Sequence, residues 1–407
     1  MEFKEYFLGE LCEIKSSKRI YAKDYVNKGV PFYRSKEIIE KSNGLDISQK
    51  LYIDNKKFEE IEEKHGVPET GDLLLTSVGT LGVPYIVKNE KFYFKDGNLT
   101  WFTNFKPLLN QYYLFYWFKS KEGIGEINRV TIGSTQKALT IKNLRYLKIT
   151  LPDKKNQFKI TNLIQKIESK LENNKQIIAN LEELSQTLFK RWFVDFEFPD
   201  ENGNPYKSSG GEMVDSELGE IPKSWKVDEL GNYIKIKSGK RPKNKVDKKD
   251  IENVVPIIGA SKIMGYTNDY LYNEKIIIIG RVGTHGVIQR FSTRTWPSDN
   301  TFVIISDFES IIYQVLKSID YISLNRGSTQ PLLSQKDIKN TKVVMPTNAT
   351  LLSKYQKENN HILKMMDQKN KENENLIQLR DTLLPKLMSG EIEIPDDIEV
   401  NEDELSI

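Results

Sequence analysis

A chain of 407 residues is longer than one hydrophobic core normally supports, so the sequence predicts two or three domains. The formal net charge is only +3, and no apolar run approaches the roughly 20 residues of a membrane-spanning helix. The charged N-terminus, with Glu2, Lys4 and Glu5, does not have the form of a signal peptide, and Cys12 is the only cysteine. We therefore expect a soluble, cytoplasmic protein without an internal disulfide or a cysteine-rich zinc site.

Positive charge is concentrated in two stretches of the chain. Residues 1–150 and 221–347 each carry a net positive charge, whereas residues 151–200 are neutral and residues 348–407 are net negative. Two nucleic-acid-binding modules joined by a neutral scaffold would have this distribution. A solvated lysine-rich surface would have it as well, so charge alone does not decide.

The first positive stretch opens with a strand-like run over residues 11–15, which leads into a basic loop at residues 16–19, and residues 236–241 repeat this pattern. A loop of Ser, Lys and Arg after a strand can bind phosphates through charge and hydroxyl groups, although a merely solvated loop has the same composition. The cations that we predict to contact DNA in and near these loops are Lys15, Lys18, Arg19, Arg34, Lys36, Lys237, Lys240, Arg241 and Lys243.

Two glycine-rich turns follow predicted buried strands, at residues 71–82 and 276–286. Neither has the Gly-Lys-Ser/Thr ending that would hold nucleotide phosphates and magnesium, so a phosphate-loop function is disfavoured. The glycines either let the backbone approach DNA closely or only form a tight turn. The candidate DNA-contacting residues of these turns are Ser77, Thr80, Arg281, Thr284 and His285.

Aromatic residues are dense over residues 112–118, shortly after Trp101, Phe102 and Phe105. Aromatic side chains can stack on bases, but they also supply large apolar area to a core. At this spacing core packing is favoured over base stacking.

A Gly-Ser-Thr-Gln tetrapeptide at residues 133–136 returns at residues 327–330, and at the same offset Leu139, Lys142, Lys148 and Pro152 recur as Leu333, Lys336, Lys342 and Pro346. The chain is therefore expected to consist of two half-molecules, each a globular region followed by a long helix. Arg, Gln, Ser and Thr side chains can read base edges, which adds as DNA-contact candidates Arg129, Ser134, Thr135, Gln136, Arg326, Ser328, Thr329 and Gln330.

Two long helices are predicted, one over residues 152–193 with Asp153 as its cap, and one that begins after Pro346 with Thr347 as its cap and meets Pro385 at its far end. Apolar residues in each keep a heptad, with Asn174 and Ser185 as polar members of the first seam. The predicted seam comprises Ile160, Ile164, Ile167, Leu171, Ile178, Leu181, Leu188, Tyr355, Ile362, Met366, Leu376 and Leu383. Two unrelated amphipathic surface helices are the alternative, but the shared register makes coincidence improbable.

Several segments together resemble one family, the DNA-specificity subunits of type I restriction-modification systems. They are Leu-Phe-Lys-Arg-Trp-Phe-Val-Asp-Phe at residues 188–196, Ser-Ser-Gly-Gly-Glu-Met-Val at 208–214, Leu-Gly-Glu-Ile-Pro at 218–222 with Trp225, and Leu-Leu-Pro-Lys-Leu-Met-Ser-Gly at 383–390. The resemblance covers nearly the whole chain, and the Gly-Ser-Thr-Gln loops are similar to the family's as well. The N-terminus departs from the pattern, because it lacks the Gly-Glu-Ile-Pro and Trp lead-in found before the second domain.

The resemblance implies an α+β chain in which two target-recognition domains, each binding half of a bipartite DNA site, are separated by two long antiparallel helices. The implied boundaries are 1–151 and 223–346 for the recognition domains, 152–198 and 347–390 for the spacer helices, 199–222 for a linker and 391–407 for an acidic tail. It also implies modification subunits, two in number, and restriction subunits as partners beside double-stranded DNA. S-adenosylmethionine and ATP with magnesium would bind to those partners.

The sequence itself offers no catalytic or metal-binding constellation. Asn204-Pro205-Tyr206 lacks the second proline of the adenine-methyltransferase motif, and the three histidines (His65, His285, His361) are scattered. We therefore predict a non-catalytic chain without a cofactor of its own. Two alternatives stay open: a self-sufficient DNA nuclease or methyltransferase with an unfamiliar site, and a coiled-coil adaptor that does not bind DNA.

Overall fold

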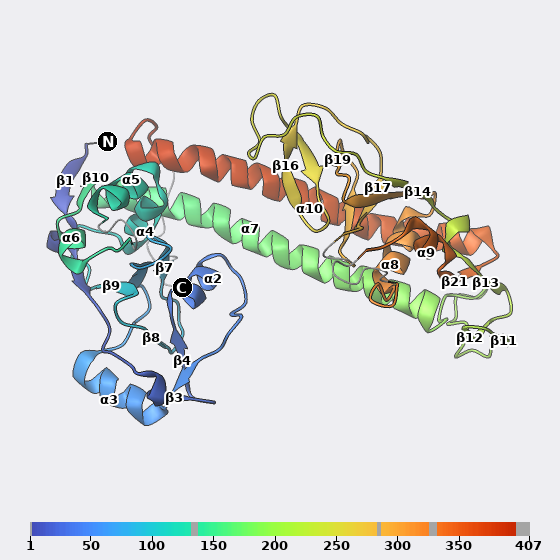
Figure 1. Cartoon of the computed structure of the whole chain (residues 1–407), viewed down its shortest axis with the longest axis horizontal. Coiled ribbons are helices and arrows are strands. Elements are labelled where there is room, and N and C mark those ends of the chain that lie inside the picture. Colours follow the sequence, from blue (N-terminus) through green and yellow to red (C-terminus); the bar gives the residue numbers. More distant parts are fainter. Residues whose placement is uncertain (1, 132–136, 283–285, 325–331, 396–407) are drawn as a thin grey trace. The chain divides into compact units, whose positions relative to one another are not determined.

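The computed structural model describes residues 2–131, 137–282, 286–324 and 332–395 (Figure 1). The chain divides into two compact units, here called unit 1 (residues 1–173 and 373–407) and unit 2 (residues 174–372). Each combines helices and sheets, which confirms the predicted α+β class. The boundary between the units falls in the middle of each of two long helices, so each unit contains half of both.

In unit 1 the described residues form an antiparallel four-stranded sheet of order β2-β9-β6-β7 (Glu13–Lys15, Leu99–Thr103, Leu73–Thr76, Pro84–Ile86). A smaller sheet has the order β3-β5-β4-β8 (Tyr25–Val26, Tyr52–Ile53, Val30–Tyr33, Tyr93–Phe94), and β1 (Lys4–Phe7) pairs with β10 (Lys148–Leu151). The shorter helical elements are α1 (Leu8–Leu11), η1 (Ala22–Asp24), α2 (Ser35–Ser42), α3 (Asn55–His65), α4 (Gln111–Lys119), α5 (Lys121–Val130) and α6 (Ile141–Arg145).

The aromatic run of unit 1 belongs to its core. Helix α4 buries Tyr113, Tyr116, Trp117 and Phe118 against strands β6 and β9, where Phe102 is fully buried. Buried rings are inaccessible to bases, so the preference for core packing over base stacking is confirmed. The strand expected at residues 11–15 is shorter than predicted, because Leu8–Leu11 forms helix α1 and only Glu13–Lys15 pairs with β9.

Unit 2 contains a four-stranded antiparallel sheet of order β14-β20-β17-β18 (Lys235–Ser238, Thr301–Ile305, Ile276–Gly280, Ile288–Phe291). A second sheet has the order β16-β15-β19 (Ile263–Thr267, Val255–Ile258, Trp296–Pro297), and β13 (Trp225–Glu229) pairs with β21 (Lys342–Pro346). The shorter helical elements are η3 (Leu230–Asn232), α8 (Glu309–Ser318) and α9 (Gln335–Asn340).

Strand β17 shows why the centre of unit 2 is a sheet. Four consecutive isoleucines, residues 276–279, form a run that is β-branched and apolar on both faces, as a strand buried on both sides requires. Ile277 and Ile279 pack into the core that contains α8, whereas Ile276 and Ile278 pack on the opposite face against Ile258. The strand is therefore held by two separate apolar contacts.

Two long helices contribute to both units: α7 (Lys154–Phe189) and α10 (Ala349–Ser389). In unit 1, Ile160 and Ile164 share a core with Leu387 and half-buried Leu383. In unit 2, Ser185 of α7 contacts Asn359 of α10, and Phe189 contacts Tyr355. The contacts on α10 thus move toward its N-terminus as α7 advances, so the two helices run antiparallel in this unit.

The predicted seam residues lie on the buried side of these helices to different degrees. Ile160, Ile164, Ile167, Leu171, Tyr355 and Met366 are buried, whereas Ile178, Leu181, Leu188, Ile362, Leu376 and Leu383 are half-buried. Leu363, which the heptad did not select, is also buried. The polar seam members Asn174 and Ser185 are fully buried.

The ends of the long helices differ in part from expectation. Asp153 caps α7 as predicted, since its carboxylate accepts a hydrogen bond from the Asn156 N–H (2.9 Å), but α7 ends at Phe189 and a π-helical turn follows over Lys190–Val194. Asn348, not Thr347, caps α10: the Asn348 side chain accepts from the Thr350 N–H (2.8 Å), while the Thr347 hydroxyl donates to the Ser224 carbonyl.

Helix α10 continues past Pro385, which lies near its far end, and fills most of the predicted range of 347–390. Pro385 lies inside the helix, which continues to Ser389. A proline removes one hydrogen bond to the carbonyl four residues earlier, and that carbonyl belongs to Asp381, an exposed residue near the end of the helix. Gly390 then ends α10 with a φ of +74°, a conformation that glycine adopts without strain.

Residues 199–222, predicted as a linker, contain the hairpin β11–β12 (Met213–Ser216, Gly219–Pro222). Tyr206 stacks on Phe198 with ring centroids 4.7 Å apart, and Phe198 stacks in turn on Trp225. This connection is therefore packed onto unit 2. Among the described residues, none of the helices combines the length and the apolar character that crossing a bilayer would need.

Candidate nucleic-acid interface

In unit 1 several chain segments meet at one end of the sheet β2-β9-β6-β7. The carbonyl of Asn98, just before β9, accepts hydrogen bonds from the Ser77 N–H (2.8 Å) and the Ser35 hydroxyl (3.1 Å). The Gly97 N–H donates to the Ser16 hydroxyl at 3.4 Å. The basic loop, the start of α2 and the turn after β6 are therefore brought together at this sheet end.

The basic loop of unit 1, residues 16–19, is tied to strand β8. The Ser17 hydroxyl donates to the Phe94 carbonyl (2.9 Å), and the Lys18 N–H donates to the Tyr93 hydroxyl (2.7 Å). Its residues line a pocket of about 250 Å³ formed by Lys15, Ser16, Ser17, Lys18, His65, Tyr93 and Trp101. His65, Tyr93 and Trp101 were not predicted, because they come from other parts of the chain and carry no local signal.

The glycine-rich turn of unit 1 begins at Ser77. Its carbonyl accepts from the Leu139 N–H (2.9 Å), and Val78 forms an isolated bridge with Ala138. Thr80 is exposed in the turn, whereas Ser77 is only 2% exposed. The predicted contacts Ser134, Thr135 and Gln136, which precede Ala138, lie outside the described residues.

Most predicted cations of unit 1 lie beside a carboxylate. Arg19 pairs with Asp96 at 2.8 Å, and Arg34 pairs with Glu37 at 2.6 Å and also donates to Gln49. Further pairs are Lys36–Glu40 (3.9 Å), Arg129–Glu126 (2.6 Å) and Lys15–Glu13 (3.9 Å), and the Lys15 ammonium also lies 4.1 Å above the Trp101 ring. Within the described part of the chain, Lys18 is exposed and has no carboxylate within 4.0 Å.

These pairs give two of the cations a role in the fold. Arg34 and Glu37 close the N-terminus of α2, since the Glu37 carboxylate also accepts from the Arg34 N–H at 2.8 Å. Burial alone would raise the pKa of Glu37, but its hydrogen bonds with Arg34 lower the pKa below its ordinary value. Arg129 is held by Glu126 one turn earlier in α5. DNA contact by either arginine would compete with its ion pair.

Unit 2 repeats the backbone arrangement of unit 1. The Arg281 N–H donates to the Asn300 carbonyl (3.0 Å), and the Arg281 carbonyl accepts from the Leu333 N–H (3.0 Å). The Gly239 N–H donates to the Thr301 carbonyl (3.0 Å). The basic loop after β14, the turn after β17 and the segment before α9 therefore meet at one end of the sheet β14-β20-β17-β18.

The basic loop of unit 2 packs closely against residues 296–298. A Cβ atom at Gly239 would lie 2.2 Å from the Ser298 carbonyl oxygen, so only glycine fits there. The Lys240 N–H donates to the Pro297 carbonyl (3.0 Å), and the Trp296 indole N–H donates to the Lys240 carbonyl (2.8 Å). The backbone of this loop is thus fixed while its charged side chains remain outside.

The predicted cations in β14 and in the loop after it are not neutralised by neighbours. Lys237, Lys240, Arg241 and Lys243 are all exposed. Considering only residues that the structure describes, none of the four has a carboxylate oxygen within 4.0 Å. Such cations are available to DNA phosphates without the loss of an existing ion pair.

Arg281 is half-buried, with its guanidinium carbon 5.5 Å from the centroid of the Phe302 ring. Its Nε atom is buried and has no acceptor among the described residues. The remaining predicted contacts of unit 2 lie outside the described residues: Thr284, His285, Arg326, Ser328, Thr329 and Gln330.

Asn98 and Asn300, whose carbonyls organise the two sheet ends, were missed by the sequence analysis. Each stands immediately before a central strand, Asn98 before β9 and Asn300 before β20. This shared position is a signal that a comparison of the two halves could have found.

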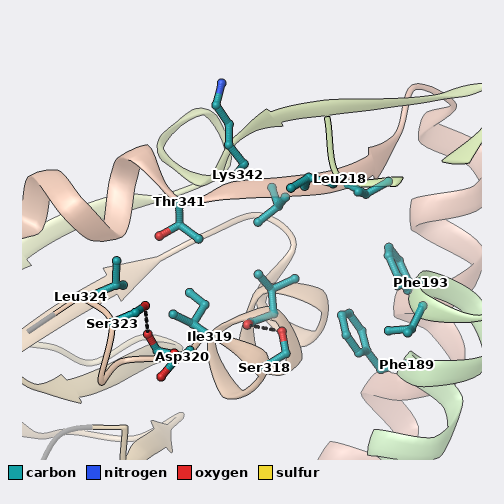
Figure 2. A pocket seen from close by; sticks show the side chains of 14 residues that line it. Phe189, Phe193, Leu218, Ser318, Ile319, Asp320, Ser323, Leu324, Thr341 and Lys342 are labelled. Carbon is teal, nitrogen blue, oxygen red and sulfur yellow. Dashed lines mark hydrogen bonds between the residues drawn. The ribbon is translucent and has the colours of Figure 1, made fainter. Parts of the chain in front are cut away.

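A separate pocket of about 330 Å³ in unit 2 contains no predicted DNA-contacting residue (Figure 2). Phe189 and Phe193 form one wall, Lys342 lies at the rim, and the opposite side comes from the segment after α8, where the Ser323 hydroxyl donates to the Asp320 carbonyl (2.8 Å). Its lining is mainly apolar. This pocket therefore has a different character from the sheet ends.

The described residues include no group of three or more His, Cys, Asp or Glu side chains that could hold a metal ion. Cys12 is buried in unit 1, and burial raises the pKa of its thiol to about 12. A thiol in that state is a poor nucleophile near neutral pH.

Comparisons with known proteins identify related sequences and a related fold. The family model "Type I restriction modification DNA specificity domain" matches residues 1–183 and 222–379. The type I restriction enzyme MjaIX specificity subunit of Methanocaldococcus jannaschii is 27% identical over 358 residues, which is 80% of this chain and 78% of that protein. The putative MjaX specificity subunit of the same organism is 24% identical over 399 residues, covering 90% of this chain and 88% of that protein.

Among solved structures, the type I restriction-modification S subunit from M. genitalium has a similar fold. Its TM-score is 0.62 at 18% sequence identity, and the match covers 95% of this chain and 96% of that chain. At this identity the likeness concerns the fold alone. Because the family model matches both units over most of their length, the chain belongs to the family of type I restriction-modification DNA-specificity subunits.

Proposed function

We propose that unit 1 and unit 2 each read one part of a bipartite DNA site and so direct methylation and cleavage by partner subunits. The observation that carries this proposal is the repeated sheet end, where equivalent backbone hydrogen bonds at Ser77 and Arg281 gather a basic loop and a glycine-rich turn. Two separate sites of the same construction are suited to two separate half-sites. Phosphate contacts would position each unit, and base contacts would specify the sequence.

An exchange of one reader tests the proposal. Residues from about 10 to 145 are replaced by those of a relative with a different target, and methylated sites are mapped by sequencing host DNA. We expect one half-site to change and the other to stay the same, because the readers are separate. A change in both half-sites would refute the two-reader proposal.

The chain itself is proposed to be non-catalytic. S-adenosylmethionine, ATP and magnesium would bind to the modification and restriction subunits, and two modification subunits would dock on the chain. The purified chain with S-adenosylmethionine alone should therefore not methylate DNA, whereas addition of the modification subunit should produce activity. Methylation by the pure chain would instead support the self-sufficient enzyme, an alternative that the comparisons do not support.

The two long helices are proposed to form an antiparallel spacer that sets the distance between the half-sites. A helix of 36 residues, the length of α7, is about 54 Å long at 1.5 Å per residue, which corresponds to roughly one and a half turns of DNA. One heptad inserted after Asn174 and one after Lys369 would lengthen the pair by about 10 Å. The unread spacer should then grow by up to about three base pairs, with both half-site sequences unchanged. An active complex with an unaltered spacer would exclude this role.

A further inference from the structure

Ser77 and Arg281 occupy equivalent backbone positions in the two units. Each directly follows a central strand, donates its N–H to the carbonyl of an asparagine (Asn98 or Asn300), and accepts a hydrogen bond from a leucine N–H at its carbonyl. Each is also followed by a valine that forms an isolated bridge, Val78 with Ala138 and Val282 with Leu332. A backbone fixed on both sides presents its side chain in a defined place.

In unit 1 the side chain at this position, Ser77, is buried. Ser77 is 2% exposed, and its hydroxyl lies 2.6 Å from the Thr100 hydroxyl and donates to the Leu75 carbonyl at 3.2 Å. Both hydroxyl groups are buried and used within the unit. Ser77 therefore has neither the reach nor a free donor with which to contact a base.

In unit 2 the same place holds a planar cation. Ile277, Ile279 and Arg281 alternate along β17 and its end, and both isoleucines belong to the core that also contains Phe302. The ring of Phe302, which stands where unit 1 has Thr100, supports the guanidinium at 5.5 Å. The side chain is thus held by its stem and by one ring face.

Among the described residues, the polar end of Arg281 is not satisfied in the way that the Ser77 hydroxyl is. Its Nε is buried without an acceptor in the described part of the chain, and a buried donor without an acceptor is costly to maintain. Because Nε is buried, the side chain has to turn toward the ligand before two adjacent acceptors can meet Nε and one terminal nitrogen together. Guanine presents this pair as O6 and N7 in the major groove, and arginine is its most common partner.

We propose that Arg281 is a specificity-determining residue of unit 2 that donates two hydrogen bonds to a guanine in the major groove, and that Ser77 reads no base. This inference rests on the proposed function, since it assigns one base contact to one of the two readers. Under this proposal the two units differ in base recognition at an equivalent backbone position. One half-site should contain a G·C pair whose recognition depends on a single side chain.

The test uses the chain in complex with its modification subunit, after its methylated motif has been mapped. Binding is measured for duplexes in which each base pair of the half-site read by unit 2 is replaced in turn, with the native chain and with Arg281→Lys and Arg281→Gln. We expect discrimination at one G·C pair to fall about 5- to 150-fold in both variants, because neither can donate the same planar pair of bonds. Preferences at the other positions should not change.

Two control variants separate the possible roles. Lys240→Gln should weaken binding to all duplexes and reduce its salt dependence without a change in base preference. Ser77→Ala should leave the preferences of both half-sites as they are. Thermal unfolding of each variant shows that it is folded.

Three outcomes would overturn the inference. If Arg281 contacts a phosphate, Arg281→Gln should weaken binding to all duplexes equally and lower the salt dependence of binding, whereas Arg281→Lys should retain binding. A purely structural role would appear as lower thermal stability with unchanged base preference. Altered base preference in Ser77→Ala would show that unit 1 reads a base at this position. Each of these results leaves the two-reader proposal intact, because the exchange of residues from about 10 to 145 tests that proposal separately.

Discussion

Units 1 and 2 build the same sheet end from equivalent backbone hydrogen bonds but place different chemistry on it. In unit 1 the cations Arg19 and Arg34 are paired with carboxylates, and Ser77 is closed inside the unit. In unit 2 the cations Lys237, Lys240, Arg241 and Lys243 are exposed, and Arg281 has a buried donor without an acceptor among the described residues. The difference shows that the two units can share one backbone scaffold and still differ in the side chains that would contact DNA.

The units also attach their sheets and short helices to the long helices differently. In unit 1 the Tyr116 hydroxyl of α4 donates to Glu168 of α7 at 2.7 Å. In unit 2, Arg290 of β18 pairs with Glu309 of α8 at 3.3 Å and with Asp367 of α10. Unit 2 has a tyrosine contact of the same kind, since the Tyr313 hydroxyl of α8 donates to Glu182 of α7 at 3.2 Å, so the largely buried ionic cluster is what distinguishes it.

The largest expected effect is on the stability of unit 2. Arg290→Leu leaves Glu309, which is 9% exposed, without its main cation, so we expect a loss of about 3 kcal/mol in the free energy of unfolding. Because Lys275 remains 3.9 Å from Glu309, the expected loss is near the lower end of the range for buried ion pairs that lose one partner. Tyr116→Phe in unit 1 should cost only about 1.5 kcal/mol. Urea unfolding followed by tryptophan fluorescence measures both, and equal losses would contradict the distinction.

The next effect concerns the basic loops. Lys240→Ala together with Arg241→Ala removes two exposed cations, so the slope of log binding constant against log salt should fall by about 1.8. Lys18→Ala together with Arg19→Ala should change the slope less, because Arg19 is paired with Asp96. Binding of the assembled complex to its target duplex at several salt concentrations provides the comparison. A larger change of slope in the double variant of unit 1 would show that its cations contribute more to phosphate binding than those of unit 2.

The helix caps should give a smaller effect that depends on pH in one unit only. Asp153→Ala and Asn348→Ala should each cost about 1 kcal/mol near neutral pH. The hydrogen bond from the Asn156 N–H lowers the pKa of Asp153 below its ordinary value of 3.8, so its contribution is present above that value and disappears as the pH falls through the lowered pKa. The neutral amide of Asn348 has no such loss.

Unfolding free energies of the two cap variants, measured from pH 6 downward, test this difference. The cost of Asp153→Ala relative to the native chain should shrink in acid, whereas the cost of Asn348→Ala should stay constant. Asp153→Asn serves as the control, because it keeps an acceptor that does not titrate. A constant cost for Asp153→Ala would show that its charge is not involved.

The smallest effect is a rate of thiol labelling that reports on unit 1 alone. Cys12 is the only cysteine of the chain, is buried in unit 1, and has a pKa raised by burial to about 12. At pH 8 it should react with a thiol reagent only when unit 1 opens. Tyr116→Phe should therefore speed labelling, whereas Arg290→Leu should not. Faster labelling in the Arg290 variant would show that unit 2 controls the opening of unit 1.

Local pattern was enough to predict several features of this protein. Residues close together in the sequence indicate the buried strand β17, the heptad spacing within α7 and α10, the buried aromatic helix α4 and the cap at Asp153. The family motifs, and with them the function class, are also contiguous. These features follow from periodicity and side-chain chemistry over a few turns, so no distant contact is needed to recognise them.

The tertiary structure alone decided which predicted site residues are available. Arg19 meets Asp96 across 77 residues of chain, and the burial of Ser77 depends on Thr100 in the neighbouring strand. Gly239 is required only because the Ser298 carbonyl lies beside it. Such contacts depend on strand order and register, which bring together residues with no relation in the sequence. A lysine or arginine in an exposed loop therefore looks the same in the sequence whether a carboxylate neutralises it or not.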